Sequence, residues 1–122
     1  MGKAKIVAIV GEAAVRKQLS GDTDREATAV AVRYLLQLLA ERAPGNTVEI
    51  RVPPFGAVQA IEGPRHTRGT PPNVIETDAA TWVALATGSL SWGDAMAADL
   101  VSASGSRADL AGQLPVMRVA SS

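Results

Sequence analysis

Residues 46–63 read NTVEIRVPPFGAVQAIEG, and this stretch decides the fold class. Three apolar residues alternate with two charged ones over residues 48–52, which is the period of a strand buried on one face. Pro53 and Pro54 follow, and because proline cannot donate a hydrogen bond to a sheet, the strand ends before them. A second apolar run, at residues 57–62, predicts an antiparallel partner. The sequence therefore predicts a β-hairpin near the middle of the chain.

The segment before this hairpin predicts a long helix over residues 24–42. Its apolar residues recur at helical spacing and are numerous enough to bury most of the helix. Thr23 and Glu26 have the spacing of a capping box, in which each side chain satisfies the other residue's free backbone N–H. Pro44 and Gly45 then end the helix.

Residues 3–20 allow two interpretations. The run IVAIVG could be a buried strand ending at Gly11, and the basic residues after it would then suggest a phosphate-binding loop. That motif needs a second glycine before the lysine and a Ser or Thr after it, whereas arginine precedes Lys17 and glutamine follows it. We therefore favour one helix over residues 5–19, in which Gly11 costs about 1 kcal/mol relative to alanine. The residues of this N-terminal helical segment do not suggest a role for it.

Two short helices are predicted after the hairpin. Asp78 is a good N-cap for the helix DAATWVALAT, and Gly88 is a good stop for it. Ser91 and Asp94 repeat the capping spacing for a second helix, WGDAMAAD.

Strands are predicted at NVIET, residues 73–77, and at LVSASG, residues 100–105, with a last helical turn in RADLAGQL, residues 107–114. Helices and strands come in runs and do not alternate, which indicates an α+β layer fold. A chain of 122 residues is expected to form a single domain over residues 1–122.

The composition excludes several function classes. Twelve basic and twelve acidic residues give a net charge of zero, which argues against nucleic acid as a partner. The chain has no cysteine and one histidine, so we expect no metal site, no cofactor and no thiol nucleophile. The apolar run near the N-terminus is too short to span a bilayer, and we expect no stable membrane insertion and a cytoplasmic protein.

Most of the chain resembles the bacterial orthologues of the sterol carrier protein family. The resemblance is carried by VRYLLQLLAERAPG (32–45), VEIRVPPFGAVQAIEGPRHTRGTPPNVIETDAATWVALATG (48–88) and LSWGDAMAADLVSASGSRADLAGQLP (90–115). It implies a curved, mainly antiparallel sheet of four to five short strands, covered by helices around an apolar cavity. It also implies a non-catalytic binder or carrier of sterols or fatty acyl chains.

The chain departs from the family pattern in two places. Asp99 stands before the last predicted strand, where a small flexible glycine is expected. Aspartate can adopt the left-handed backbone that such a turn needs at modest cost. The residues before about position 24 resemble nothing in the family.

If a lipid cavity exists, its walls are expected to be the apolar faces of the helices and the hairpin. The candidate residues are Leu35, Leu38, Leu39, Ile50, Val58, Ile61, Trp82, Leu85, Trp92 and Met96. A closed core is the favoured interpretation for each of them, because apolar periodicity indicates burial before it indicates a ligand.

The segment EGPRHTRGTPPN, residues 62–73, is the candidate polar site. Arg65, His66 and Arg68 lie within four residues, between glycines and prolines that restrict the loop. Two guanidinium groups and an imidazole could hold a carboxylate or a phosphate. The alternative is an ordered loop in which the flanking glutamates neutralise these side chains, and this is the favoured interpretation.

Three functions are consistent with these residues. The first is a non-catalytic binder of a lipid, a fatty-acid-like molecule or a small apolar acid. The second is an interaction or regulatory module, acting as a homodimer or through a partner surface. The third and least favoured is an enzyme, which would have to use His66 as its acid or base because the chain has no other histidine.

Overall fold

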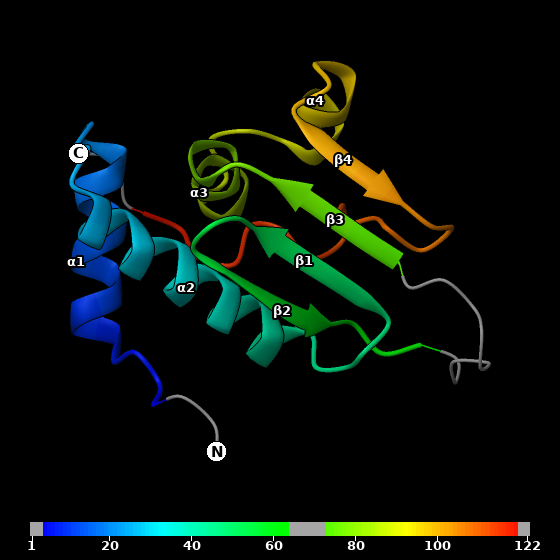
Figure 1. The fold of residues 1–122 in the computed structure, drawn as a ribbon, viewed down its shortest axis with the longest axis horizontal. Coiled ribbons are helices and arrows are strands. Elements are labelled where there is room, and N and C mark those ends of the chain that lie inside the picture. Colours follow the sequence, from blue (N-terminus) through cyan, green and yellow to red (C-terminus); the bar gives the residue numbers. More distant parts are fainter. Residues whose placement is uncertain (1–3, 64–72, 120–122) are drawn as a thin grey trace.

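The structure is a computed structural model, and it describes residues 4–63 and 73–119. Its elements, in chain order, are α1 (Ala8–Leu19), α2 (Arg25–Arg42), β1 (Val48–Val52), β2 (Gly56–Ala60), β3 (Asn73–Thr77), α3 (Ala79–Thr87), α4 (Trp92–Ala97) and β4 (Val101–Ser104). The order agrees with the predicted one up to β4, and the predicted α+β fold is confirmed. Figure 1 shows α2 between α1 and the sheet.

The sheet has four strands in the order β2-β1-β3-β4. β1 and β2 form the predicted antiparallel hairpin, with Val52 opposite Gly56. β3 lies parallel to β1, and β4 is antiparallel to β3. The sheet is therefore mixed, with β2 and β4 as its two edges.

The two faces of the sheet differ in polarity. The apolar residues of β1 are at most 1% exposed, because they point into the core. Glu49 and Arg51 point the other way and form an ion pair of 2.8 Å, and Gln59 of β2 lies opposite Glu49 on the same face. The alternation read from the sequence thus separates a buried face from a polar one.

α2 begins one residue later than the sequence predicts. Its N-cap is Asp24, whose side chain accepts a hydrogen bond of 2.9 Å from the backbone N–H of Ala27. The predicted capping box of Thr23 and Glu26 is wrong. Aspartate caps a helix at least as well as threonine, and Asp22 supports this start because its side chain accepts a hydrogen bond from the Asp24 N–H.

α1 is a single helix, so the helical interpretation is confirmed for residues 8–19 and the phosphate loop is wrong. The helix begins at Ala8, three residues later than predicted, and residues 5–7 are extended. Gly11 is buried in the middle of α1 and faces the ring of Tyr34 in α2. A Cβ atom at this position would overlap the Tyr34 ring, so glycine allows the two helices to approach closely.

The caps of the later helices are confirmed. The Asp78 side chain accepts a backbone hydrogen bond of 2.8 Å at the start of α3, and Gly88 ends that helix in the left-handed conformation. Ser91 caps α4 in the same way, at 3.1 Å. Asp99 has a φ of 59°, so it adopts the left-handed turn expected of the glycine that it replaces.

The predicted last helical turn is wrong, because residues 107–114 form turns and no helix. The side chain of Asp109 accepts a hydrogen bond of 2.8 Å from the N–H of Ala111, and this local bond competes with helical pairing. The segment still contributes to the core, since Leu110 is fully buried. Beyond it, the N–H groups of Val116 and Met117 both donate to the carbonyl of Ala86 in α3.

The close contact of α1 and α2 predicts the effect of Gly11→Ala. We expect the substitution to lower the free energy of unfolding by about 1–3 kcal/mol, because the new methyl group forces α1 away from Tyr34. Urea denaturation measures this change. Gly93→Ala is the matched control, because Gly93 is also helical and has nothing near its Cβ position. The control should be neutral or stabilising by up to about 1 kcal/mol, and equal effects of the two substitutions would contradict the close packing.

Candidate functional site

A hollow of about 500 Å³ lies between α2, β2 and an extended N-terminal segment. We call it the α2–β2 groove, and we call residues 4–6 the strap. The groove is within the size range of small-molecule sites, which are commonly 300–1,000 Å³. It forms at the β2 edge of the sheet, where no further strand covers the space beside α2.

The walls of the groove are mainly apolar. Its apolar side chains come from every element around it and are Ile6, Val30, Leu36, Phe55 and Val58. Gly56, at the start of β2, has no side chain to fill the groove. A Cβ atom there would lie 3.4 Å from Leu36 Cδ1 and 3.5 Å from Arg33 Cγ. A methyl group would fit at this position, but a longer side chain would enter the groove.

Two arginines fix the turn between β1 and β2. Arg33 Nε donates a hydrogen bond of 2.7 Å to the carbonyl of Phe55. The guanidinium of Arg25 lies 5.3 Å from the centre of the Phe55 ring, within the range of a cation–π contact. Both arginines thus contact Phe55, and Arg33 also lines the groove.

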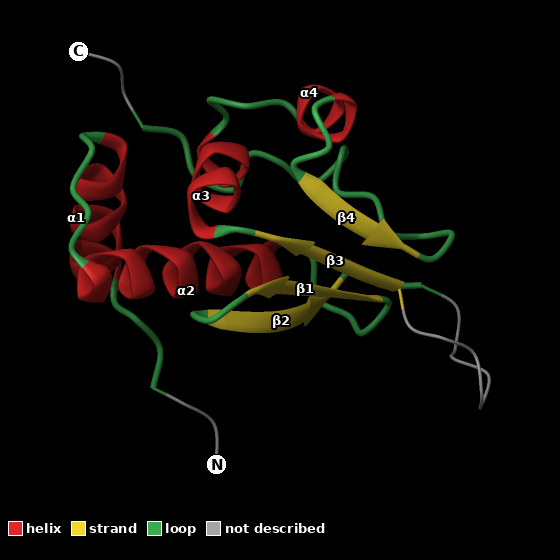
Figure 2. Ribbon diagram, turned by 45° about the horizontal axis from the view of Figure 1, so that its top comes forward, coloured by secondary structure: helices red, strands yellow, loops and turns green. Residues whose placement is uncertain are grey.

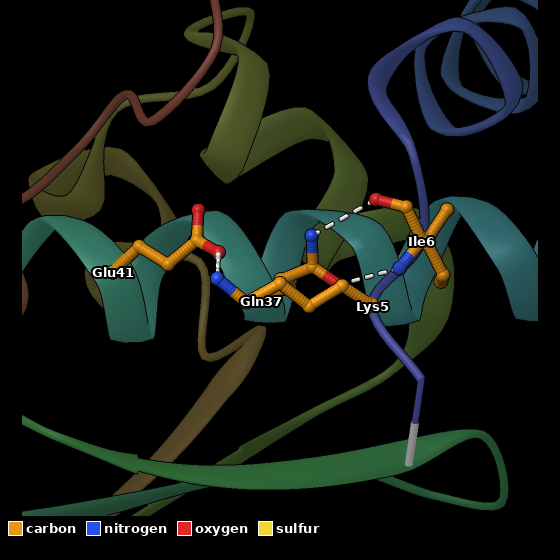
Figure 3. Close-up of polar contacts among 4 residues, drawn as sticks. All are labelled: Lys5, Ile6, Gln37 and Glu41. Carbon is orange, nitrogen blue, oxygen red and sulfur yellow. Dashed lines mark hydrogen bonds and ion pairs between the residues drawn. The ribbon is translucent and has the colours of Figure 1, made fainter.

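The strap is joined to α2 by polar contacts with two of its residues (Figure 3). The N–H of Ile6 donates a hydrogen bond of 2.9 Å to Gln37 Oε1, and Gln37 Nε2 donates one of 3.0 Å to the carbonyl of Ile6. Lys5 Nζ lies 3.1 Å from a carboxylate oxygen of Glu41. The strap therefore forms one wall of the groove, with Lys5 beside Gln37 and Arg33 on its polar side.

The comparisons with known proteins identify the family. The sequence model of the family described as bacterial SCP ortholog matches residues 24–116. The chain belongs to this family of bacterial sterol carrier protein orthologues. No curated protein matches the sequence.

The family match covers only part of the groove. In this sterol carrier protein orthologue it begins at Asp24, the N-cap of α2, and therefore includes α2 and the β1–β2 hairpin. α1 and the strap lie before it. Two walls of the groove thus lie within the matched residues. The third wall, which the strap forms, lies outside them.

The predicted apolar residues divide between the core and the surface. Five of them belong to the hydrophobic core and are at most 1% exposed: Leu35, Leu39, Ile50, Trp82 and Leu85. Leu38, Ile61 and Trp92 are half-buried against this core, and Met96 is 42% exposed. Val58 alone among the ten lines the groove. The core is further tied together by Trp82, whose Nε1 donates a hydrogen bond of 3.3 Å to the carbonyl of Val32.

The predicted anion loop cannot be placed, since Arg65, His66 and Arg68 lie outside the described residues. Their role as an anion site stays a prediction. Glu76, one of the glutamates that flank the loop, lies on the polar face of the sheet, where its charge helps to raise the pKa of Arg51.

In residues 4–63 and 73–119, two side chains have shifted pKa values, and both lie outside the groove. Burial is the largest cause that raises the pKa of Tyr34, followed by the charges of Glu12 and Glu41. The hydrogen bond to Glu49, followed by its charge, raises the pKa of Arg51. Both shifts follow from packing and ion pairing that stabilise the fold.

The part of the chain that the structure describes holds neither a metal-binding cluster nor a membrane-spanning helix. In residues 4–63 and 73–119, no three His, Cys, Asp or Glu side chains gather in a way that could hold a metal ion. Within the same ranges, no helix combines the length and the apolar character needed to cross a membrane.

The sequence missed most residues of the groove. The predicted apolar candidates do not include Ile6, Val30, Leu36 or Phe55. The predicted polar candidates do not include Arg33. Leu36 is 1% exposed and belongs to the core as well as to the groove wall, so its apolar periodicity indicates burial and gives no separate signal for the groove. No local pattern in the sequence indicates where the strap lies.

The division between core and surface predicts unequal effects of truncation. We expect Leu35→Ala to lower the free energy of unfolding by about 2–5 kcal/mol, because a fully buried leucine leaves a cavity that its neighbours cannot fill. Met96→Ala, at an exposed site, should change it by about 0.5 kcal/mol or less. Both values come from urea denaturation, and a cost for Leu35→Ala as small as that for Met96→Ala would show that Leu35 does not pack in a solid core.

Proposed function

We propose that this sterol carrier protein orthologue is a non-catalytic carrier that binds a lipid or a small apolar acid in the α2–β2 groove. The observation that carries the proposal is an apolar hollow of about 500 Å³ at the edge of the sheet, beside cationic side chains. Family membership supports a role of the lipid-carrier type.

The apolar walls supply the affinity in this proposal. Each methylene group moved from water into an apolar site contributes about 0.8 kcal/mol. Because about 1.4 kcal/mol corresponds to a factor of ten, affinity should rise about fourfold with each added methylene until the groove is full. The rigid hairpin, held at Phe55 by two arginines, keeps the site open without a ligand.

The polar lining favours an acidic head group over a neutral one. Lys5, Arg33 and Gln37 are its charged or amide side chains, and none of the described lining residues is acidic. Lys5 is already paired with Glu41, so Arg33 is the stronger candidate to meet a carboxylate. Its Nε is engaged with Phe55, which orients the guanidinium and leaves its terminal nitrogens for the head group.

Filling the groove tests the proposal. We expect Gly56→Leu to weaken binding of a fluorescent long-chain fatty acid at least about tenfold, because the new side chain displaces two or more methylenes of the ligand. Gly56→Ala is the matched control and should bind within about twofold of the unchanged protein, since its methyl group fits. Fluorescence titration measures both, and native mass spectrometry shows whether a lipid co-purifies. Unaltered binding by Gly56→Leu would place the ligand elsewhere.

The head-group preference is tested with Arg33→Gln. We expect it to weaken binding of a fatty acid about tenfold, as for the loss of a charge-assisted hydrogen bond. Binding of the fatty alcohol of the same length should change less than about twofold. Arg25→Gln removes a second cation from Phe55 outside the groove and serves as the control. Equal losses for the acid and the alcohol would mean that Arg33 acts only by holding the turn.

A further inference from the structure

The strap completes a groove that the family domain alone leaves open on one side. It consists of residues 4–6 and lies before the family match at residues 24–116. It passes beside α2 in an extended form and leads into α1 at Val7, which is the N-cap of that helix. The access of a ligand to the groove therefore depends on how firmly this segment is held.

One side chain holds the strap. The Gln37 amide accepts from the N–H of Ile6 and donates to its carbonyl, at 2.9 and 3.0 Å, so it pairs with the main chain of Ile6 in both directions (Figure 3). An amide is the only kind of side chain end that offers both a carbonyl oxygen and an NH₂ group. Glutamate could accept but not donate, and alanine could do neither.

The other contacts of the strap are weak. Lys5 and Glu41 form an ion pair whose side chains are 78% and 43% exposed, and such pairs contribute little to stability. Ile6 packs against the edge of the core, whereas Lys5 and Val7 are exposed. Val7 has an extended backbone and its carbonyl accepts the first helical hydrogen bond of α1, from the Gly11 N–H, so the strap joins α1 at this residue.

α1 itself stays in place when the strap moves. Gly11 is packed against Tyr34, and Ala14 and Val15 are buried as well. The strap is thus a short segment attached to a firmly packed helix. Its position beside α2 is set by Gln37.

We propose that Gln37 is a clasp that controls access to the α2–β2 groove: the strap turns at Val7 when the two bonds to Ile6 break, and it holds the ligand when they form again. This inference rests on the proposed carrier function. Because the clasp is a neutral pair, its closure is expected to depend little on salt, unlike the ion pair of Lys5 with Glu41.

The test compares Gln37→Ala with Gln59→Ala. Gln59 is an exposed glutamine on the polar face of the sheet, away from the groove, and is the matched control. Amide hydrogen exchange of Ile6 in the ligand-free protein measures opening of the clasp. Stopped-flow fluorescence with a fluorescent long-chain fatty acid measures association and dissociation. We expect Gln37→Ala to raise the Ile6 exchange rate and both ligand rates about tenfold, because two hydrogen bonds are lost.

A second variant separates the clasp from a change in the groove wall. Gln37→Glu keeps the acceptor for the Ile6 N–H but loses the donor. Because its carboxylate would also repel a fatty acid, its ligand rates are measured with the fatty alcohol of the same length, and these rates and its exchange rate should fall between those of the unchanged protein and Gln37→Ala. Ligand rates that match the Gln59→Ala control, while Ile6 exchange is faster, would overturn the gating role and leave the carrier function standing. If the unchanged protein binds no fatty acid or sterol, the carrier function fails and gating fails with it, whatever the exchange rates show.

Discussion

One turn of α2, residues 34–37, contacts α1, the core, the groove and the strap. An α-helix advances about 100° per residue, so four consecutive side chains point in four directions. Tyr34 meets Gly11 of α1, Leu35 enters the core, Leu36 lines the groove and Gln37 holds the strap. Figures 1 and 2 show α2, which carries this turn, between α1 and the sheet.

The placement of α1 and the strap depends on that turn as well. α1 lies outside the family match and packs against α2 through the close approach of Gly11 to Tyr34 and the buried side chains of Ala14 and Val15. The same helix carries the strap to Gln37, which is 31 positions further along the chain than Ile6. Packing between two helices thus places the third wall of the groove, which lies outside the family match.

The sequence predicted the elements well, because their signals are local. The alternation in VEIRV, the caps at Asp78 and Ser91 and the left-handed turn at Asp99 depend on residues a few positions apart. The last helical turn was wrong for the same kind of reason, since Asp109 makes a competing local bond. The groove could not be predicted, because periodicity indicates that Leu36 is apolar but not what lies opposite it. Gln37 meets Ile6 only in the folded chain.

The size of the domain explains why its hollow lies at an edge. At about 24 cal/mol per Å³, an empty cavity of 500 Å³ inside the core would cost about 12 kcal/mol. That is close to the whole stability of a typical domain, which is about 5–15 kcal/mol. The core residues accordingly pack with almost no exposure, and the hollow lies beside the edge strand β2, where water can fill it. A site at an edge needs some other means of keeping water from a bound apolar ligand. A strap held by the amide of Gln37, an exposed ion pair and the packing of Ile6 would meet that need.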